Sequence, residues 1–258
     1  MTEGSRKVAL VTGAESGIGA ASAAALAAAG HDLAVLYFRD GDAAAKTVAA
    51  VEQAGGRAVA IQCDVSAEAS VEAAFDQAIA ALGVPSVLVN SAGINQSGVA
   101  VEKMGFDQWK RMFGADLDGA FLTSRRLVRE LAKTPMAGRI INVSSIHGFA
   151  MRAGAADYCA AKGALDNLTQ VLSLEVAARG ITVNAIAPGM ILTPMNEKAV
   201  DDVAYRQSLE HNIPAQRAGT ATEVASLVAY LASDQAAYIT GAILTIDGGL
   251  SLQLGQGA

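Results

Sequence analysis

The fold is decided by the stretch Val8-Ala9-Leu10-Val11-Thr12-Gly13-Ala14-Glu15-Ser16-Gly17-Ile18-Gly19. Its first four residues are apolar, which predicts a buried parallel strand. Glycines follow at 13, 17 and 19, and the alanine-rich residues 20–29 predict a helix. Glycines let a backbone approach a pyrophosphate, and a helix N-terminus supplies free N–H groups. The spacing G-x-x-x-G-x-G differs from the standard G-x-G-x-x-G. We therefore expect a nucleotide site here, with a tight turn that binds nothing as the alternative.

Strand-like and helical patterns alternate along the rest of the chain. The expected strands are Val8–Val11, Leu33–Tyr37, Ala58–Gln62, Val87–Val89, Ile140–Val143, Thr182–Ile186 and Ile243–Ile246. The expected helices are Ala20–Ala29, Ala43–Ala54, Ala67–Ala81, Phe106–Ala132, Tyr158–Ala178 and Thr222–Ser233. Such alternation predicts an α/β fold: a Rossmann-type, doubly wound parallel sheet of about seven strands with helices on both faces. A ligand then lies beyond the carboxyl ends of the strands.

Length and composition indicate one domain over residues 1–258, with 52% hydrophobic and 17% charged residues. The net charge of −6 and the absence of a basic cluster argue against nucleic-acid and membrane partners. Two cysteines, Cys63 and Cys159, suggest a reducing compartment, and neither they nor the three scattered histidines predict a metal site. The uncharged run Gln77–Val101 is broken by Gly83, Pro85 and Asn90, so it is not read as a membrane span. Without a visible signal peptide, we expect a cytoplasmic protein.

A second motif combines Ser145 with Tyr158-Cys159-Ala160-Ala161-Lys162. Residues four apart on a helix share one side, so Lys162 would lie one turn beyond the Tyr158 phenol. An ammonium near a phenol favours the phenolate, and such a tyrosine can exchange a proton with a carbonyl or alcohol oxygen. A nearby serine hydroxyl can bond that same oxygen. Alone, Y-x-x-x-K is weak; the alternative is a core tyrosine with a solvated lysine.

Together these motifs make the chain resemble the short-chain dehydrogenase/reductase family. The resemblance extends to the segments Cys63-Asp64-Val65, Asn90-Ser91-Ala92-Gly93, Pro188-Gly189-Met190-Ile191-Leu192-Thr193 and Asp247-Gly248-Gly249. It implies an NAD(P)-dependent oxidoreductase that transfers a hydride reversibly between a nicotinamide and a carbonyl or secondary alcohol. Within the family, the 3-oxoacyl-[acyl-carrier-protein] reductase and glucose 1-dehydrogenase groups are most similar. The alternative is a nucleotide-binding regulatory protein with little turnover.

The resemblance also implies roles for individual residues. Tyr158 would be the general acid or base, Ser145 would polarise the carbonyl, and Lys162 would keep Tyr158 partly ionised and bond the nicotinamide ribose. The implied cofactor-binding residues are Gly13, Ser16, Gly17, Ile18, Gly19, Arg39, Asp64, Val65, Asn90, Ala92, Gly93, Tyr158, Lys162, Pro188, Gly189, Ile191 and Thr193.

Asp116 departs from the family, which usually has asparagine there. A carboxylate at this position would offset the charge of Lys162 acting on the phenol, which makes Asp116 a fourth catalytic candidate. If only its backbone carbonyl matters, the exchange is tolerated.

The choice of cofactor depends on Tyr37-Phe38-Arg39-Asp40, the end of the second expected strand. A carboxylate at the strand end would bind the ribose 2′-hydroxyl of NAD and repel a 2′-phosphate. Phe38 is neutral there, and Arg39 can bond a phosphate, so NADP(H) is preferred and NAD(H) stays possible. Glu15 and Asp40 add nearby negative charge that weakens this preference.

The substrate side is less defined by the sequence. The irregular segment of approximately 189–217 is long for a compact domain, which predicts a functional, partly helical lid over a small-molecule substrate. His147 lines the substrate pocket or is an ordinary loop residue, and Phe149, Met190 and Met195 form a pocket wall or pack structurally. The resemblance implies a homotetramer or a dimer, with Phe106–Ala132 and Tyr158–Ala178 in one interface and the C-terminal segment in another.

Overall fold

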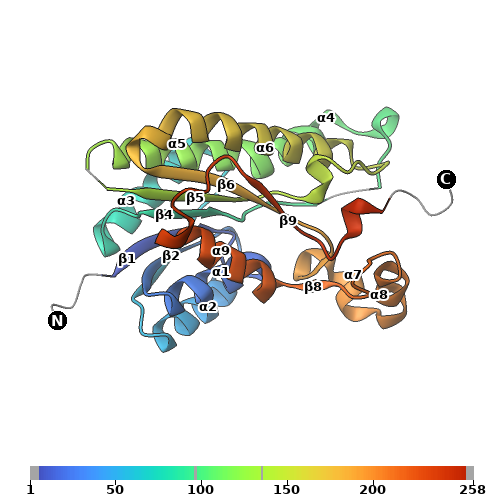
Figure 1. The fold of residues 1–258 in the computed structure, drawn as a ribbon, viewed down its shortest axis with the longest axis horizontal. Coiled ribbons are helices and arrows are strands. Elements are labelled where there is room, and N and C mark those ends of the chain that lie inside the picture. Colours follow the sequence, from blue (N-terminus) through green and yellow to red (C-terminus); the bar gives the residue numbers. More distant parts are fainter. Residues whose placement is uncertain (1–5, 96–97, 135, 254–258) are drawn as a thin grey trace.

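The computed structural model describes residues 6–95, 98–134 and 136–253. Within them, seven parallel strands form one sheet in the order β3-β2-β1-β4-β5-β6-β9 (Figure 1). Their bounds are β1 (Lys7–Thr12), β2 (His31–Tyr37), β3 (Ala58–Gln62), β4 (Val87–Asn90), β5 (Gly138–Val143), β6 (Ile181–Pro188) and β9 (Ile243–Ile246). The chain builds outward from β1 in one direction and from β4 in the other. The doubly wound α/β fold expected from the alternating pattern is therefore confirmed.

Helices cover both faces of the sheet (Figure 1). One face carries α1 (Gly17–Ala28), α2 (Gly41–Gln53) and α9 (Ala221–Ala232), and the other carries α3 (Glu68–Leu82), α5 (Gly119–Leu131) and α6 (Ala156–Val176). Two apolar cores result, one on each side. Leu26 and Val228 belong to the first core, and Phe75 and Leu127 to the second. Because both faces are covered, the central strands are buried throughout, as their continuous apolar runs predict.

The register of the strands brings the sequence motifs to one edge of the sheet. Thr12, at the end of β1, pairs with Leu36 and with Asn90, and Asn90 pairs with Asn142. The loops that follow β1, β4, β5 and β6 therefore leave the sheet side by side. This is the edge at which a doubly wound sheet binds its ligand.

The helix expected over Phe106–Ala132 is confirmed, with a π-helical segment within it. It consists of α4 (Phe106–Phe113), a π-helical segment (Gly114–Asp118) and α5. Gly119, where α5 begins, packs directly on Val65: a Cβ there would lie 2.7 Å from Val65 Cγ2. A π segment widens the helix locally, and such segments are frequent at functional sites. This one carries Asp116.

The segment 189–217 contains β7 (Ile191–Leu192), α7 (Glu197–Asp201) and α8 (Val203–Glu210). It ends just before β8 (Gly219–Thr220), which pairs with β7 in a second, two-stranded parallel sheet. Figure 1 shows α7 and α8 beyond the helical layers, next to β8. The segment is partly helical, as expected, whereas the small sheet was not predicted. Its role as a lid stays a proposal.

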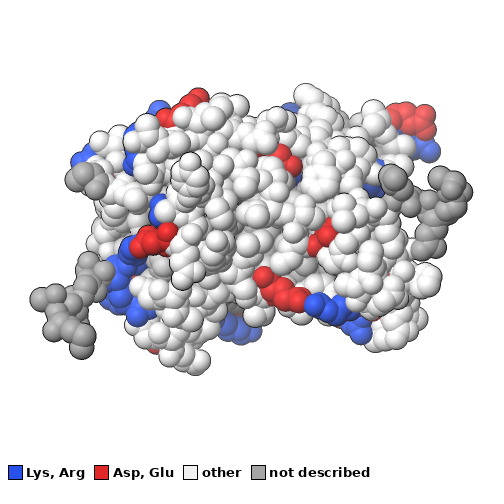
Figure 2. All heavy atoms as spheres, viewed as in Figure 1, with Lys and Arg blue, Asp and Glu red and all other residues white. Residues whose placement is uncertain are grey.

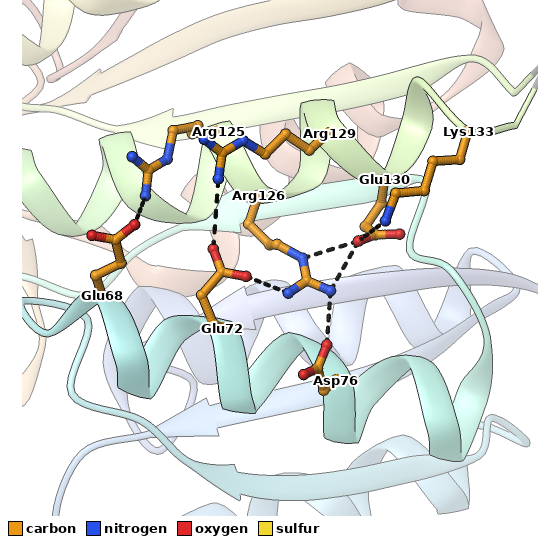
Figure 3. A network of polar contacts seen from close by, with 8 residues as sticks. All are labelled: Glu68, Glu72, Asp76, Arg125, Arg126, Arg129, Glu130 and Lys133. Atoms are coloured by element: carbon orange, nitrogen blue, oxygen red, sulfur yellow. Dashed lines mark hydrogen bonds and ion pairs between the residues drawn. The ribbon is translucent and has the colours of Figure 1, made fainter.

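An ion-pair network joins α3 to α5 on the surface of the second helical layer (Figure 3). Its centre is Arg126, whose side chain is only 11% exposed and contacts Glu72, Asp76 and Glu130. Burial by itself would lower the pKa of the Arg126 guanidinium, but these carboxylates outweigh it, so its pKa is raised. The network fixes α5, which follows the π segment directly, against α3.

Candidate active site

A cleft of about 1820 Å³ opens at the carboxyl edge of the sheet. It is bordered by the loops after β1, β2, β4, β5 and β6, and by α4 and α8. The residues proposed from the sequence that line it are Gly13, Ser16, Gly17, Ile18, Arg39, Asp64, Val65, Ala92, Gly93, Asp116, Ser145, Tyr158, Lys162, Pro188, Gly189, Ile191 and Thr193. The topology thus brings together motifs that are far apart in the chain.

The glycine loop has the shape that a pyrophosphate requires. Gly13 has φ +62°, and a Cβ there would lie 2.8 Å from Ala92 Cα, so no larger residue fits without moving the backbone. α1 begins at Gly17, and its N-cap residue Ser16 makes no side-chain capping bond. The first N–H groups of the helix therefore have no side-chain acceptor from the cap. This cradle fits the pyrophosphate of a nicotinamide dinucleotide.

Two residues proposed for cofactor contact, Gly19 and Asn90, do not line the cleft, and their contact with the cofactor stays a prediction. Gly19 lies inside α1 against the Gly13 carbonyl. The Asn90 side chain is buried, donates to Asn142 Oδ1 at 2.8 Å and accepts from Thr123 Oγ1 at 2.7 Å. Asn142 in turn donates to Thr169 Oγ1 at 2.8 Å, which ties β4, β5, α5 and α6 together. Both residues therefore pack outside the cleft and support the segments that line it.

Thr12 fixes the loop after β4 to the end of β1. Its hydroxyl oxygen accepts hydrogen bonds from the backbone N–H groups of Ser91 and Ala92, both at 3.0 Å. Ala92 is also the residue against which Gly13 packs. The two loops therefore form one rigid wall of the cleft.

Ser145, Tyr158 and Lys162 line the cleft together, although they come from different elements. Ser145 follows β5, and its Oγ accepts from the His147 N–H at 3.1 Å. Tyr158 lies in the first turn of α6 and is 7% exposed. The Lys162 ammonium lies one turn further on, 5.6 Å from the centre of the Tyr158 ring. The arrangement agrees with the spacing argument from the sequence.

Asp116 reaches Lys162 with its carboxylate. The distance from Asp116 Oδ2 to Lys162 Nζ is 3.1 Å, and the two side chains are only 1% and 6% exposed. Asp116 Oδ1 accepts from the Ile94 N–H at 2.8 Å, and Lys162 Nζ donates to the Val143 carbonyl at 3.0 Å. The side chain, rather than the backbone carbonyl alone, is thus in contact with the lysine.

The charges of this buried pair depend on each other. Burial raises the pKa of the Asp116 carboxyl above its usual value, and the nearby Lys162 ammonium opposes only part of that rise. Burial alone would lower the pKa of Lys162, but its interaction with the buried Asp116 carboxyl outweighs burial and raises the pKa. Lys162 therefore stays an ammonium at neutral pH, with the Asp116 carboxyl as its neighbouring acidic group.

His147 occupies the cleft wall beside Tyr158. Its Nδ1 lies 2.7 Å from the Ala150 carbonyl, so this nitrogen carries the proton, and its ring meets the Tyr158 ring edge-on at 6.2 Å. Of the two readings of the sequence, the structure favours the pocket position over an ordinary loop position. Met190 and Met195 also line the cleft, whereas Phe149 does not and is half exposed.

Several lining residues were not singled out from the sequence. Trp109 and Phe113, four apart on α4, stack with ring centres 4.7 Å apart. Tyr205, Leu209 and Ile213 come from α8 and the turn after it. The spacing of the two aromatic residues on the expected helix was a usable signal. The α8 residues carried no such signal, because only the folded segment brings them to the cleft.

The described parts of the chain contain no cluster of three or more histidine, cysteine or acidic side chains able to hold a metal ion. None of their helices combines the length and the apolar character that crossing a membrane requires. The expected absence of a metal stays a prediction.

The family model described as enoyl-(acyl carrier protein) reductase matches residues 13–251, nearly the whole chain. The chain belongs to the short-chain dehydrogenase/reductase family. The matched range contains the glycine loop, Ser145, Tyr158 and Lys162, the residues on which the resemblance rested.

Similar members of the short-chain dehydrogenase/reductase family span the full length. A 3beta-hydroxysteroid dehydrogenase 1 from Eggerthella lenta is 41% identical, with 97% of each chain covered. Glucose 1-dehydrogenase 2 from Bacillus subtilis is 34% identical, with 97% of this chain and 96% of that protein covered. The crystal structure of acetoin dehydrogenase from Enterobacter cloacae is 39% identical, covers 98% of both chains and has a TM-score of 0.90.

These findings establish the class of reaction. As a short-chain dehydrogenase/reductase, the protein is an NAD(P)-dependent oxidoreductase acting on CH–OH groups and the corresponding carbonyls. The alternative of a regulatory nucleotide-binding protein is not supported by the comparisons.

Proposed function

We propose that the cleft oxidises a secondary alcohol and reduces the matching ketone on a mainly apolar small molecule. The observation that carries this proposal is that Ser145, Tyr158 and Lys162 share the cleft with the glycine cradle. A bound nicotinamide supplies or accepts the hydride. The chain's own residues manage the substrate oxygen and its proton.

In the proposed mechanism, Tyr158 donates the proton to the substrate oxygen during reduction and removes it during oxidation. The Ser145 hydroxyl bonds the same oxygen and polarises the carbonyl. The Lys162 ammonium lies next to the phenol. The Val143 carbonyl and the Asp116 carboxylate hold it in place. Residues 189–217 act as a lid that closes over the substrate and keeps water out.

An apolar substrate is favoured by the lining of the cleft. Trp109, Phe113, Leu209 and Ile213 present aromatic and aliphatic groups, while His147 is a polar group next to Tyr158. Apolar pockets with a few placed polar groups are typical of small-molecule sites. The named substrates of the relatives, a hydroxysteroid, acetoin and glucose, mark out the range to test.

The test is a substrate panel followed by the absorbance of the reduced nicotinamide. Ketosteroids, hydroxy ketones, 3-oxoacyl esters and glucose are each assayed with NAD(H) and NADP(H). We expect turnover of ketones with apolar substituents and slower oxidation of glucose. Turnover of glucose alone would contradict the apolar assignment, and no turnover with any substrate would favour the regulatory alternative.

NADP(H) is the proposed preferred cofactor, with NAD(H) also accepted. Phe38 leaves the end of β2 without a carboxylate of its own, and Arg39 follows it. The Arg39 guanidinium lies over the Phe38 ring, 4.8 Å from its centre. In the part of the chain that the structure describes, no acidic group forms an ion pair with Arg39. A 2′-phosphate would give it a charged partner.

Titration with NADPH and NADH tests this preference. NADPH should bind more tightly, and its binding should weaken with salt. Arg39→Ala should weaken NADPH binding roughly tenfold or more while leaving NADH almost unchanged, since hydrogen bonds to charged groups contribute about 1.5–3 kcal/mol. Tighter binding of NADH by the unmodified protein would contradict the NADP(H) preference.

A homotetramer is the proposed assembly. On α5 and α6, Phe121, Val171 and Leu174 are exposed apolar side chains, and Leu174 is 82% exposed. β9 is a sheet edge, and Figure 2 shows a mostly uncharged surface where β9 and α9 lie in Figure 1. Two such faces suit the two interfaces of a symmetric tetramer. Light scattering should give the mass of four chains; a monomer would contradict the proposal.

The cytoplasmic location likewise stays a proposal, which cell fractionation tests.

A further inference from the structure

The Glu15 carboxylate occupies the end of β2 although it belongs to another loop. The Ala14 N–H before it bonds the Leu36 carbonyl at 2.9 Å, which ties the glycine loop to β2. Glu15 Oε1 then accepts the Phe38 N–H at 3.1 Å. The strand end, which has a neutral residue in the sequence, therefore has a carboxylate in the fold.

The other carboxylate oxygen of Glu15 has no partner. Oε2 is buried and receives no hydrogen bond from the residues that the structure describes. A buried acceptor without a donor is unfavourable, and such groups in native proteins usually accept a hydrogen bond from a bound partner. Glu15 lines the cleft together with Phe38, Arg39 and Asp64. A hydroxyl group of a bound ligand would satisfy Oε2.

We propose that Glu15 is a specificity-determining residue for the cofactor. This proposal rests on the proposed dinucleotide-dependent function. In it, Glu15 Oε2 accepts a hydrogen bond from the ribose hydroxyl at the adenosine end of NAD(H). Its negative charge opposes a 2′-phosphate at the same place. Glu15 thus favours NAD(H) and Arg39 favours NADP(H). The cofactor selectivity of the enzyme is set by the difference between their contributions to binding.

Asp40, the acid that follows Arg39 in the chain, is engaged elsewhere. Its Oδ1 accepts the Ala43 N–H at 2.9 Å and caps α2, and it is not among the residues lining the cleft. Asparagine caps helices about as well as aspartate. Asp40→Asn therefore removes a charge close to Glu15 while keeping the cap, which makes it the matched control.

The experiment measures the Kd of NADH and of NADPH by calorimetric titration for the unmodified protein, Glu15→Gln and Asp40→Asn. Glutamine keeps an oxygen for the Phe38 N–H but has no charge. We expect Glu15→Gln to bind NADPH roughly tenfold more tightly and NADH roughly tenfold more weakly. Asp40→Asn should leave the ratio of the two Kd values close to that of the unmodified protein.

The outcomes separate the two proposals. Binding of a dinucleotide with the same Kd ratio in Glu15→Gln overturns the role of Glu15 and leaves the proposed function standing. An equal change in Asp40→Asn also overturns it, because the effect would then be general charge. No binding of either dinucleotide to the unmodified protein overturns the proposed function, and the role of Glu15 with it. If Glu15→Gln does not fold, Glu15→Asp, whose carboxylate is set back by one methylene, should change the ratio in the same direction by less.

Discussion

The Lys162 ammonium is held between the Val143 carbonyl and the Asp116 carboxylate, both close to 3 Å away. An ammonium with an adjacent carboxylate exerts a weaker net field on a third group than an ammonium alone. The Tyr158 phenol is that third group, with Lys162 5.6 Å from its ring centre. In the proposed mechanism, an ionised Asp116 would therefore weaken the field of Lys162 at the Tyr158 phenol.

Asp116→Asn should move the rise of the oxidation rate to lower pH. The substitution removes the charge that compensates Lys162, so the ammonium favours the deprotonated phenol more strongly. The amide oxygen of asparagine can still accept the Ile94 N–H, which keeps the backbone in place. We expect a shift on the order of one pH unit in the kcat profile. An unchanged profile would show that the carboxylate has no electrostatic role.

At the residue scale, the spacing of Tyr158 and Lys162 predicted that they share one side of a helix, and α6 begins just before Tyr158. The place of Ser145 beside them was implied by the resemblance to the family. The proximity of Asp116 to Lys162 was implied by the resemblance to the family, but the sequence left open whether the carboxylate or the backbone carbonyl makes the contact. The structure shows the carboxylate 3.1 Å from Lys162 Nζ. The position of Glu15 depends on tertiary structure. The sequence places it in the glycine loop, and only the pairing of β1 with β2 brings it to Phe38.

At the scale of secondary-structure elements, α5 is held to α3 by the ion pairs of Arg126 (Figure 3). Arg126→Met, which keeps the apolar stem, should lower the free energy of unfolding by about 1–3 kcal/mol. Arg129→Met is the control. Arg129 is 58% exposed and lies 4.0 Å from Glu72, so its loss should change stability by less than about 0.5 kcal/mol. Urea unfolding measures both, and equal losses would contradict a central role for Arg126.

The junction of the proposed lid with α9 should respond to acid. The Arg217 hydrogen bond, together with bonds from Thr220, lowers the pKa of Glu223 from 4.5 to about 2. A carboxyl group whose pKa is lower in the folded than in the unfolded state stabilises the protein at pH values above its unfolded pKa. This stabilisation is lost as the pH falls toward the folded pKa. Glu223→Gln should therefore destabilise the protein at pH 7, with the difference from the unmodified protein shrinking as the pH falls below 4.5. A difference that is constant with pH, measured by urea unfolding, would contradict this.

The seven strands were predictable because buried parallel strands are continuous apolar runs bounded by turns. The π segment within the helix over Phe106–Ala132 was not, because the apolar spacing continues through it without a proline. The pairing of β7 with β8 was also missed. Each has only two residues, too few to show a pattern.

At the scale of the whole molecule, the topology explains why the site forms. The sheet order reverses between β1 and β4, so the helices that follow these strands, α1 and α5, lie on opposite faces of the sheet and leave room for a ligand at its carboxyl edge. The proposed catalytic residues after β5 and on α6 then meet the cradle formed by β1 and α1. One cleft can in this way bind a dinucleotide and hold a substrate oxygen beside Tyr158.

The central claim is that Tyr158 exchanges the proton while the rest of the cleft binds the cofactor. The most direct measurement is kcat for the best panel substrate, together with the dinucleotide Kd, for Tyr158→Phe beside the unmodified protein. Phenylalanine fills the same buried space and lacks only the hydroxyl. We expect kcat to fall roughly 10²–10⁴-fold, with the Kd almost unchanged. Near-normal kcat with normal cofactor binding would contradict the account.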